Sequence, residues 1–386
     1  MNRKITLNEV DAPFKVKVEK IDGIVKFDID NAYPTRMERL IDGSVTAKAS
    51  AGMLQRFMIG QGFENEELNK IVVGKDRFGR NTTLYHALGK AARSISYNHG
   101  FYFRMQYNGD LKTTGLRAES FKDCRFGRMD SQDNAGKIVV YNNWDKERGK
   151  SILKSNWNRV DVYNTNEKAV AAQIAAAGGF EAWKGQIFFW FNDDEYIYPV
   201  SPVDPALYDA DTEKQISLFK NGELRRGFFM KYIIHHTAFD NPQDAIEFKA
   251  ALKKMMGGGH EYSSMVLEGD FDDEGKLKEG PNIHIEKIEQ NINAKIFEAY
   301  ETSTTNQMRK AFYAIPQILI EYEDSKLGTT SGEALRQAGE FYNTQTEDLR
   351  KNISQCFAEI MSNWHEDLGE QDFTIKPLQL GTAVDV

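Results

Sequence analysis

The most constraining feature of this 386-residue chain is an ordered run of elements from Asp204 to Leu319. Asp204-Pro205 is a typical helix start, because Asp accepts hydrogen bonds from free backbone amides and a first-turn proline has no amide to satisfy. The helix is predicted to end at Asn221-Gly222, since glycine tolerates the left-handed conformation that closes a helix. It would then be about 26 Å long.

A small α/β unit is predicted to follow this helix. Residues 227–236 are rich in β-branched and aromatic side chains and are short enough to form a strand. Residues 241–255 start with Asn-Pro and then place apolar side chains at helical spacing. Residues 262–269 and 282–288 are predicted as two more strands, with an acidic loop at 270–280 between them.

From Ala294 onward the apolar spacing becomes helical again, and Pro316 should stop the hydrogen-bond ladder. A small α/β unit is therefore expected between two long helices. The apolar stripe of the second helix consists of Phe297, Tyr300, Thr304, Met308, Phe312 and Ile315.

Both flanking regions are predicted to mix helices with strands. A helical stretch should follow Tyr33-Pro34 and close at Gly60, and a second helix should cover 82–97. Residues 331–367 have apolar side chains at steps of three, four or seven, which predicts one or two long amphipathic helices. Short strands are predicted at 101–107, 114–117, 123–128 and 138–141.

Composition excludes several classes of protein. The formal net charge of -8 argues against a protein that grips nucleic acid over its whole surface, because phosphate binding needs clustered Lys and Arg. It is compatible with a channel through which DNA slides and equally with an ordinary soluble protein. Only Cys124 and Cys356 occur, so a disulfide framework or zinc ribbon is not expected. We expect neither secretion nor a membrane span, and synthesis in the cytoplasm.

Searches for catalytic motifs fail. Asp270, Asp272 and Glu274 begin like a calcium loop, but Pro281 stands where a bidentate Glu belongs. His235-His236 lies in a predicted strand, so the two rings should point to opposite faces. The aromatic group around Trp183 and Phe188 to Phe191 could stack on bases, but has few basic neighbours, which favours core or subunit packing. No catalytic residue, cofactor or metal site is expected.

Three segments of the Asp204–Leu319 run carry a family resemblance. They are Leu218-Phe219-Lys220-Asn221-Gly222, Met265-Val266-Leu267-Glu268-Gly269 and Ala314-Ile315-Pro316-Gln317-Ile318-Leu319. In this order the chain resembles the portal proteins of tailed bacteriophages, the head-tail connectors of the large long-tail-phage family. The last segment departs from the family pattern at Gln317, where a second proline is usual, and at Ile320, where a glycine is usual.

The resemblance implies an α+β, portal-like fold in which a short crown, or none, follows the C-terminal helices. The N-terminal wing would comprise residues 1–200, and the C-terminal wing or crown helices and tail residues 333–386. The two stem helices would be residues 201–226 and 291–320. The clip between them would be residues 227–290, and the candidate tunnel loop residues 321–332.

The resemblance also implies a function and a set of site residues. The chain would form a dodecameric ring at one capsid vertex of a virion, as a channel for double-stranded DNA during packaging and ejection. Its partners would be the major capsid protein, the terminase and a head-tail adaptor. The alternative is a metal-dependent nucleic-acid-processing enzyme with an unrecognised site. Implied site residues are Lys326, Thr329 and Thr330 for the tunnel loop, Phe297, Tyr300, Met308 and Phe312 for stem packing, and Asp270, Asp272, Asp273 and Lys276 for clip docking.

Overall fold

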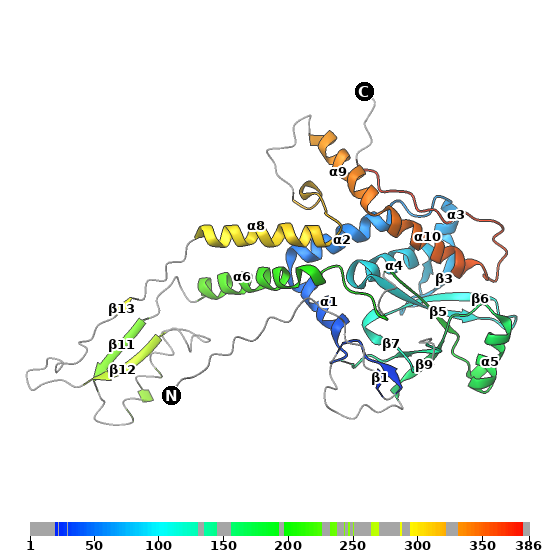
Figure 1. The fold of residues 1–386 in the computed structure, drawn as a ribbon, viewed down its shortest axis with the longest axis horizontal. Helices are drawn as coiled ribbons and strands as arrows, with labels where there is room; N and C mark the ends of the chain where they lie inside the picture. The colour runs from blue at the N-terminus through cyan, green and yellow to red at the C-terminus, as the bar shows by residue number, and fades with distance from the viewer. Residues whose placement is uncertain are drawn as a thin grey trace, which may run out of the picture. The chain divides into compact units, whose positions relative to one another are not determined.

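The protein was analysed as a computed structural model that divides into two compact units. The first unit combines residues 1–211 with 304–386, and the second comprises 212–303. Helices and strands are mixed in each, so the predicted α+β class is confirmed (Figure 1). The structure describes residues 20–21, 23–28, 30–129, 135–144, 156–192, 197–225, 232–237, 243, 246–247, 250, 264–269, 286–287, 294–321 and 331–380.

The first helical stretch is broken into α1 (Tyr33–Gly43) and α2 (Val45–Ile59). The sequence predicted a single stretch ending at Gly60, and that end is correct. The break arises at Ser44, whose backbone is extended and whose side chain accepts a hydrogen bond from the amide of Ala47 at 3.0 Å. Serine competes with the helical backbone in this way, so it ends one helix and caps the next.

The chain then forms α3 (Glu66–Lys70), a hairpin of β3 (Val72–Lys75) and β4 (Asn81–Thr83), and α4 (Leu84–Asn98). The hairpin and α3 were not predicted. Helix α4 lies within two residues of its predicted bounds, and it buries a face of small and aliphatic side chains against α2.

A six-stranded sheet forms the middle of the first unit, with the strand order β6-β5-β10-β9-β8-β7. All neighbours are antiparallel except β9 and β10, which are parallel and are connected through α5 (Glu167–Ala177). A separate two-stranded ladder joins β1 (Lys20–Ile21) to β2 (Ile24–Val25). The six strands are β5 (Gly100–Tyr107), β6 (Thr113–Glu119), β7 (Cys124–Phe126), β8 (Lys137–Val140), β9 (Asn158–Val162) and β10 (Gln186–Phe191).

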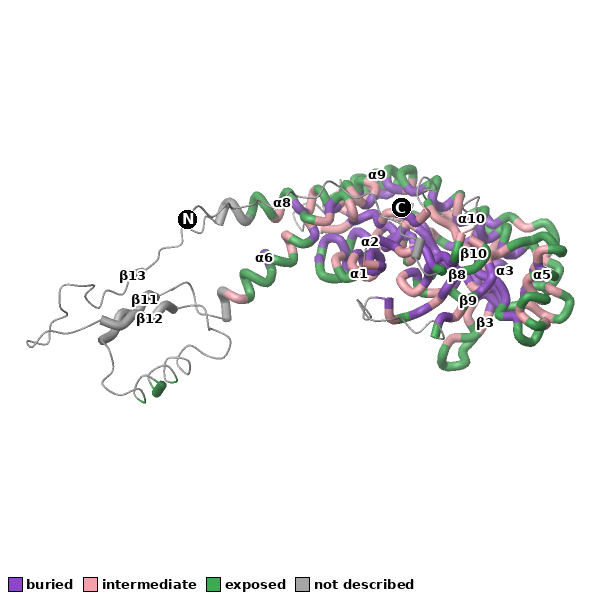
Figure 2. Tube along the Cα trace, turned by 60° about the horizontal axis from the view of Figure 1, so that its bottom comes forward, coloured by how far each residue is buried: buried purple, intermediate pink, exposed green. Residues whose placement is uncertain are grey.

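Both faces of the central strand β5 are buried. Phe103 packs edge-on against Phe357 of the C-terminal helix α10 (Glu347–Met361), with ring centroids 5.9 Å apart. Tyr102, which points to the opposite face, lies 5.1 Å from Phe121 and 5.6 Å from Phe191. Successive side chains of a strand point to opposite faces, so the sheet has two apolar layers. Figure 2 shows this buried interior as a continuous region.

The C-terminal part of the chain packs onto the same unit. Helix α9 (Ser331–Gln345) is followed by α10, which agrees with the prediction of one or two helices in this region. The tail after α10 then runs alongside residues 61–64, with the amide of Gln61 donating to the carbonyl of Lys376 at 3.0 Å. Gly60 has a positive φ of 54°, and any side chain there would collide with the Lys376 carbonyl.

The Asp204–Leu319 run has the predicted order of elements but different ends. Helix α6 (Leu207–Arg225) follows a 3₁₀ turn at Asp204–Ala206, and α8 spans Ala294–Ala311. Contrary to the prediction, α6 continues through Asn221-Gly222. A glycine inside a helix costs only about 1 kcal/mol relative to alanine, which neighbouring helical residues can offset.

Three strands in the second unit form one sheet. Strand β11 (Tyr232–Thr237) pairs in parallel with β12 (Ser264–Gly269) and antiparallel with the short β13 (Glu286–Lys287). Strands β12 and β13 lie inside the segments predicted as strands, and β11 extends one residue beyond its predicted segment, to Thr237. Most of the predicted helix between β11 and β12 lies outside the described residues. Within the described part of the chain, no helix combines the length and apolarity needed to cross a membrane.

Candidate functional site

One face of the C-terminal half of α8 is fully buried in the first unit. Thr304, Met308 and Phe312, spaced four residues apart on one helix face, are 4%, 0% and 0% exposed. The hydroxyl of Ser44 contacts the sulfur of Met308 at 3.2 Å. Since the same hydroxyl accepts the α2 capping bond from Ala47, one side chain joins the start of α2 to α8.

The last turn of α8 is also tied to α9. The hydroxyl of Tyr342 donates to the backbone carbonyl of Phe312 at 2.9 Å, and the Tyr342 ring packs edge-on against Phe57 with centroids 4.8 Å apart. Burial raises the pKa of Tyr342 well above its ordinary value, so this hydroxyl remains a donor. Residues from three distant segments therefore fix the position of this turn.

The chain leaves α8 through two consecutive residues in the left-handed region, Tyr313 (φ 64°) and Ala314 (φ 55°). This conformation costs roughly 1–2 kcal/mol for each residue with a side chain. Tyr313 offsets part of that cost, because its hydroxyl accepts from Asn192 at 3.2 Å and contacts His99 Nε2 at 3.3 Å. Burial raises the pKa of Tyr313 to about 12. The predicted helix end near Pro316 is thus four residues too late.

The segment that leads into α6 is held by tyrosines. Tyr33 donates to the Asp204 carboxylate at 2.9 Å and accepts from the amide of Ser201 at 3.0 Å. Burial raises the pKa of the Asp204 carboxyl, and the Tyr33 hydrogen bond partly opposes that rise. The sequence correctly predicted that a helical region begins here, but the capping role predicted for Asp204 is wrong. Asp204 is the first residue of a 3₁₀ turn whose cap position is Val203, and its described carboxylate contact is with Tyr33. No local pattern links residues 171 positions apart.

A buried arginine fixes the strand next to this segment. Arg125 is 0% exposed, and its guanidinium donates to the side chain and carbonyl of Asn31 and to the carbonyls of Lys122 and Cys124. Burial lowers the pKa of Arg125. Nothing in the sequence Cys124-Arg125-Phe126 signals that this cation is internal.

Apolar side chains on other parts of α6 and α8 are exposed. Tyr208 is 64% exposed, and Leu218 and Tyr300 are each 54% exposed. In the second unit an ion pair joins Lys220 of α6 to Glu301 of α8, so the two helices lie beside each other there. We call the exposed side chains of the second unit, Leu218 and Tyr300, the open stem face.

The structure separates the residues predicted for stem packing. Met308 and Phe312 lie in the core of the first unit, whereas Tyr300 is on the open stem face. Phe297 belongs to α8, but its side-chain surroundings are not described. The predicted tunnel-loop residues Lys326, Thr329 and Thr330 and the predicted clip-docking residues Asp270, Asp272, Asp273 and Lys276 lie outside the described residues.

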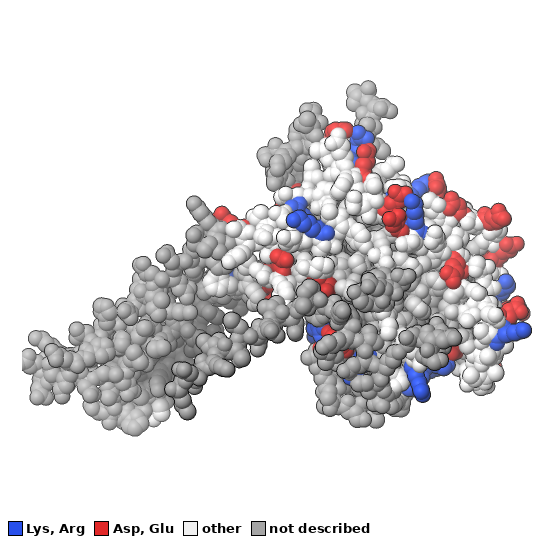
Figure 3. All heavy atoms as spheres, viewed as in Figure 1, with Lys and Arg blue, Asp and Glu red and all other residues white. Residues whose placement is uncertain are grey.

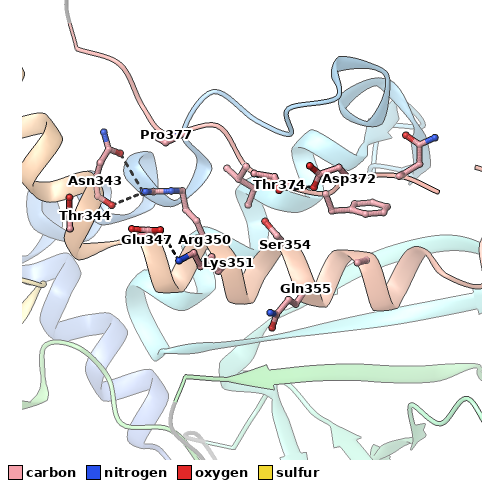
Figure 4. Close-up of a pocket in the computed structure, with 14 residues that line it drawn as sticks. Asn343, Thr344, Glu347, Arg350, Lys351, Ser354, Gln355, Asp372, Thr374 and Pro377 are labelled. Carbon is pink, nitrogen blue, oxygen red and sulfur yellow. Dashed lines mark hydrogen bonds and ion pairs between the residues drawn. The ribbon is translucent and has the colours of Figure 1, made fainter. Parts of the chain in front are cut away.

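A groove of about 700 Å³ runs between α10 and the tail that follows it (Figure 4). The charged side chains that line this groove form hydrogen bonds or ion pairs with neighbouring side chains or with the backbone. Arg350 donates to Thr346 and to the carbonyls of Phe57 and Asn343, and Lys351 pairs with Glu347 at 2.7 Å. The groove therefore offers polar lining but no unpaired cation to a substrate.

In the portion of the chain that is described, no three His, Cys, Asp or Glu side chains gather closely enough to hold a metal ion. The described residues therefore provide no metal centre for the alternative enzyme function.

Comparisons identify the fold. No protein-family model matches the sequence, and a search of curated proteins gives no significant match. Among solved structures, a chain in the virion of a native gene transfer agent particle has a TM-score of 0.51 and is 13% identical, over 89% of this chain and 83% of that chain.

Two other solved structures match with TM-scores below 0.5. A chain from the neck of the native gene transfer agent particle, computed with C12 symmetry, has a TM-score of 0.46 and 11% identity, over 86% of this chain and 81% of that one. An HK97-family phage portal protein from Corynebacterium diphtheriae has a TM-score of 0.40 and 9% identity, over 78% and 84%. The chain thus has the fold of a protein found in the virion of a gene transfer agent particle.

Proposed function

We propose that this chain is a portal protein, which forms a ring at one vertex of a phage capsid and lets double-stranded DNA through. One observation carries the proposal. Helices α6 and α8 flank a three-stranded sheet in the sequence of an α+β chain, and the fold of the chain matches that of a virion chain over 89% of its length. The portal-like segments described above fall at the end of α6, on β12 and directly after α8.

The open stem face supports assembly into a ring. Leu218 and Tyr300 expose more than half of their surfaces, which is unfavourable for large apolar side chains left in water. When identical subunits contact each other through two different faces, each subunit is rotated relative to the previous one. The subunits form a ring if these rotations add up to a full turn. Neighbouring copies in such a ring would cover Leu218 and Tyr300 on both sides. We assign Phe297 to the same contact between neighbouring copies.

The charge balance suits passage of DNA better than tight binding. The chain has eight more acidic than basic residues, and Figure 3 shows acidic and basic side chains interspersed over the visible face of the described residues. Phosphate contacts that are few and scattered leave DNA free to slide. We assign Lys326, Thr329 and Thr330 to a loop that faces the channel.

The remaining partners follow from the ring. We assign the clip loop with Asp270, Asp272, Asp273 and Lys276 to docking of the terminase and later of the head-tail adaptor. The first unit would contact the major capsid protein. Twelve subunits are proposed, located at the portal vertex of the virion after synthesis in the host cytoplasm.

Negative-stain microscopy of the purified chain tests the proposal. End-on views should show toroids with a central hole, and light scattering coupled to size exclusion should give a mass near twelve subunits. Particles without a hole, together with a monomeric mass at micromolar concentration, would argue against a portal ring.

A further inference from the structure

The tip of the β3–β4 hairpin presents an exposed aromatic ring between two cations. Phe78 is 73% exposed, and the guanidinium carbons of Arg77 and Arg80 lie 5.6 and 5.2 Å from its ring centroid. Both arginines are within cation–π range, which is about 6 Å. The ring and the two cations thus form one compact feature, here called the hairpin knob (Arg77, Phe78, Arg80).

The hairpin knob is held in a fixed shape by Asp76. One carboxylate oxygen of Asp76 accepts from the amides of Phe78 and Arg80 at 2.8 and 3.0 Å, and the other accepts from Arg80 Nε at 2.7 Å. Gly79 supplies the positive φ of 79° that the turn requires. Little conformational entropy is lost when such a preformed tip binds a partner.

Phe and Arg together are typical of residues that dominate the energy of protein interfaces. The local charge of the hairpin is positive, because Lys75, Arg77 and Arg80 outnumber Asp76. A complementary surface would therefore be an apolar pocket with an acidic rim.

The first unit contains a pocket that combines apolar and acidic side chains. A cavity of about 430 Å³ lies where the tail leaves α10, within the range of about 300–1,000 Å³ typical of ligand pockets. Met361, Trp364 and Phe373 contribute buried apolar side chains to its lining. Trp364 Nε1 is buried and has no hydrogen-bond partner among the described residues. The wall of the pocket thus holds three apolar side chains and one indole N–H without a described partner.

The pocket has an acidic rim. Glu366 and Asp367 line it and are exposed, and Lys112 is the single Lys or Arg in its lining. Residues 359–372 contain five acidic residues and no Lys or Arg. We call this site the acidic pocket (Met361, Trp364, Glu366, Asp367, Phe373).

The hairpin knob and the acidic pocket are separate surfaces of the first unit, formed by different residues. A knob on one surface and a complementary pocket on another allow each copy to bind the next in head-to-tail order, the arrangement that generates rings.

We propose that the hairpin knob of one copy inserts Phe78 into the acidic pocket of the neighbouring copy, where Arg77 faces Glu366 and Asp367. The inference rests on the proposed ring and names one contact that closes it. It places a copy-to-copy contact in the first unit, separate from the open stem face.

Site-specific photo-crosslinking tests the contact in the full-length assembled protein. Benzoylphenylalanine replaces Phe78, and equal amounts of unlabelled and nitrogen-15-labelled chains are mixed before assembly and irradiation. We expect mixed-isotope crosslinks to the tryptic peptide that begins at Asn352, which contains the acidic pocket. Crosslinks confined to one copy, to a different face, to a capsid protein or to DNA would each overturn the proposal.

Charge reversal provides a second test that does not depend on the crosslinker. Arg77→Glu should weaken assembly about tenfold, and the double variant Glu366→Lys/Asp367→Lys should weaken it similarly. Combining the three changes should restore most of the affinity. Lys168→Glu, an equal charge change on the exposed surface of α5, is the matched control and should assemble like the unmodified chain.

The outcomes distinguish this contact from the ring itself. Toroids in which Phe78 crosslinks elsewhere would overturn the contact and leave the ring standing. Head-to-tail oligomers with the expected crosslink but no closed toroid would support the contact and contradict the ring. Arg77→Glu that assembles normally would also reject the contact.

Discussion

The sheet of the first unit and the two helices α6 and α8 use similar side chains in opposite ways. In β5, Tyr102 and Phe103 are each 1% exposed, since helices and loops cover both faces of the strand. On the open stem face, Leu218 and Tyr300 are each 54% exposed. The body completes its own core, whereas the helices leave apolar side chains exposed that other copies would cover in the proposed ring.

The sharpest test of this comparison uses the two ends of α8. Phe312→Ala should lower the free energy of unfolding by about 3–5 kcal/mol, because it opens a cavity in a filled core. Tyr300→Ala should change it by less than about 0.5 kcal/mol. Urea unfolding followed by circular dichroism at a concentration where the chain is monomeric measures both. Equal losses would mean that both ends of α8 are internal.

Charges on the open stem face should prevent assembly without unfolding the chain. Leu218→Asp combined with Tyr300→Asp should weaken self-association at least about thirtyfold, because a charge buried in an apolar contact is costly. Sedimentation velocity gives the association, and the melting temperature should stay unchanged. A double variant that still forms intact rings would show that other surfaces hold the copies together.

A smaller effect is expected from the hydroxyl that ties α9 to α8. Tyr342→Phe leaves the buried Phe312 carbonyl without its described donor and should cost about 1–2 kcal/mol of unfolding free energy. Tyr85→Phe, on an exposed surface of α4, serves as control and should have almost no effect. If Tyr342→Phe matched this control, the α8 end would be held by packing alone.

The smallest effect concerns Asp204 and depends on pH. Burial raises its pKa in the folded state above the unfolded value of about 3.9, so the folded chain binds more protons in the interval between the two values. The contribution of Asp204 to stability therefore falls as pH rises through that interval. Asp204→Asn should stabilise the protein at neutral pH, with an advantage that shrinks toward pH 4.5.

Thermal melts across that range measure the advantage of Asp204→Asn. Asp110→Asn, in the exposed turn between β5 and β6, removes the same charge and is melted in parallel as the reference variant. If the gain in stability of Asp204→Asn over the unmodified chain instead grew at low pH, folding would lower the pKa of Asp204, which contradicts the assigned direction.

The elements themselves were largely predictable, because their signals are local. Asp204-Pro205 marked the start of the α6 region. The alternation of apolar and polar residues predicted both ends of β5 to within one residue. The ends of helices were less accurate. Asn221-Gly222 did not stop α6, since a glycine permits a helix end without requiring one. Tyr313 and Ala314 ended α8 early through a conformation that their residue types do not favour.

Long-range partners could not be predicted. The contact of Ser44 with Met308 spans 264 positions, and that of Tyr33 with Asp204 spans 171. Hydrophobic spacing identified Met308 and Phe312 as residues of one buried face, but could not distinguish a core of this chain from an interface with another copy. The same periodicity predicts burial in either setting.

The pairing of the tail with residues 61–64 affects how the protein can be synthesised. The tail lies beside Gly60, whose lack of a side chain makes room for it, and α10 covers Phe103 of the sheet. Residues near position 60 leave the ribosome some 300 residues before their partners at 374–376. Until residues 374–376 have been synthesised the first unit is incomplete, and the face of the sheet that contains Phe103 is not yet covered by α10. Folding of the first unit should therefore finish only after almost the whole chain has emerged.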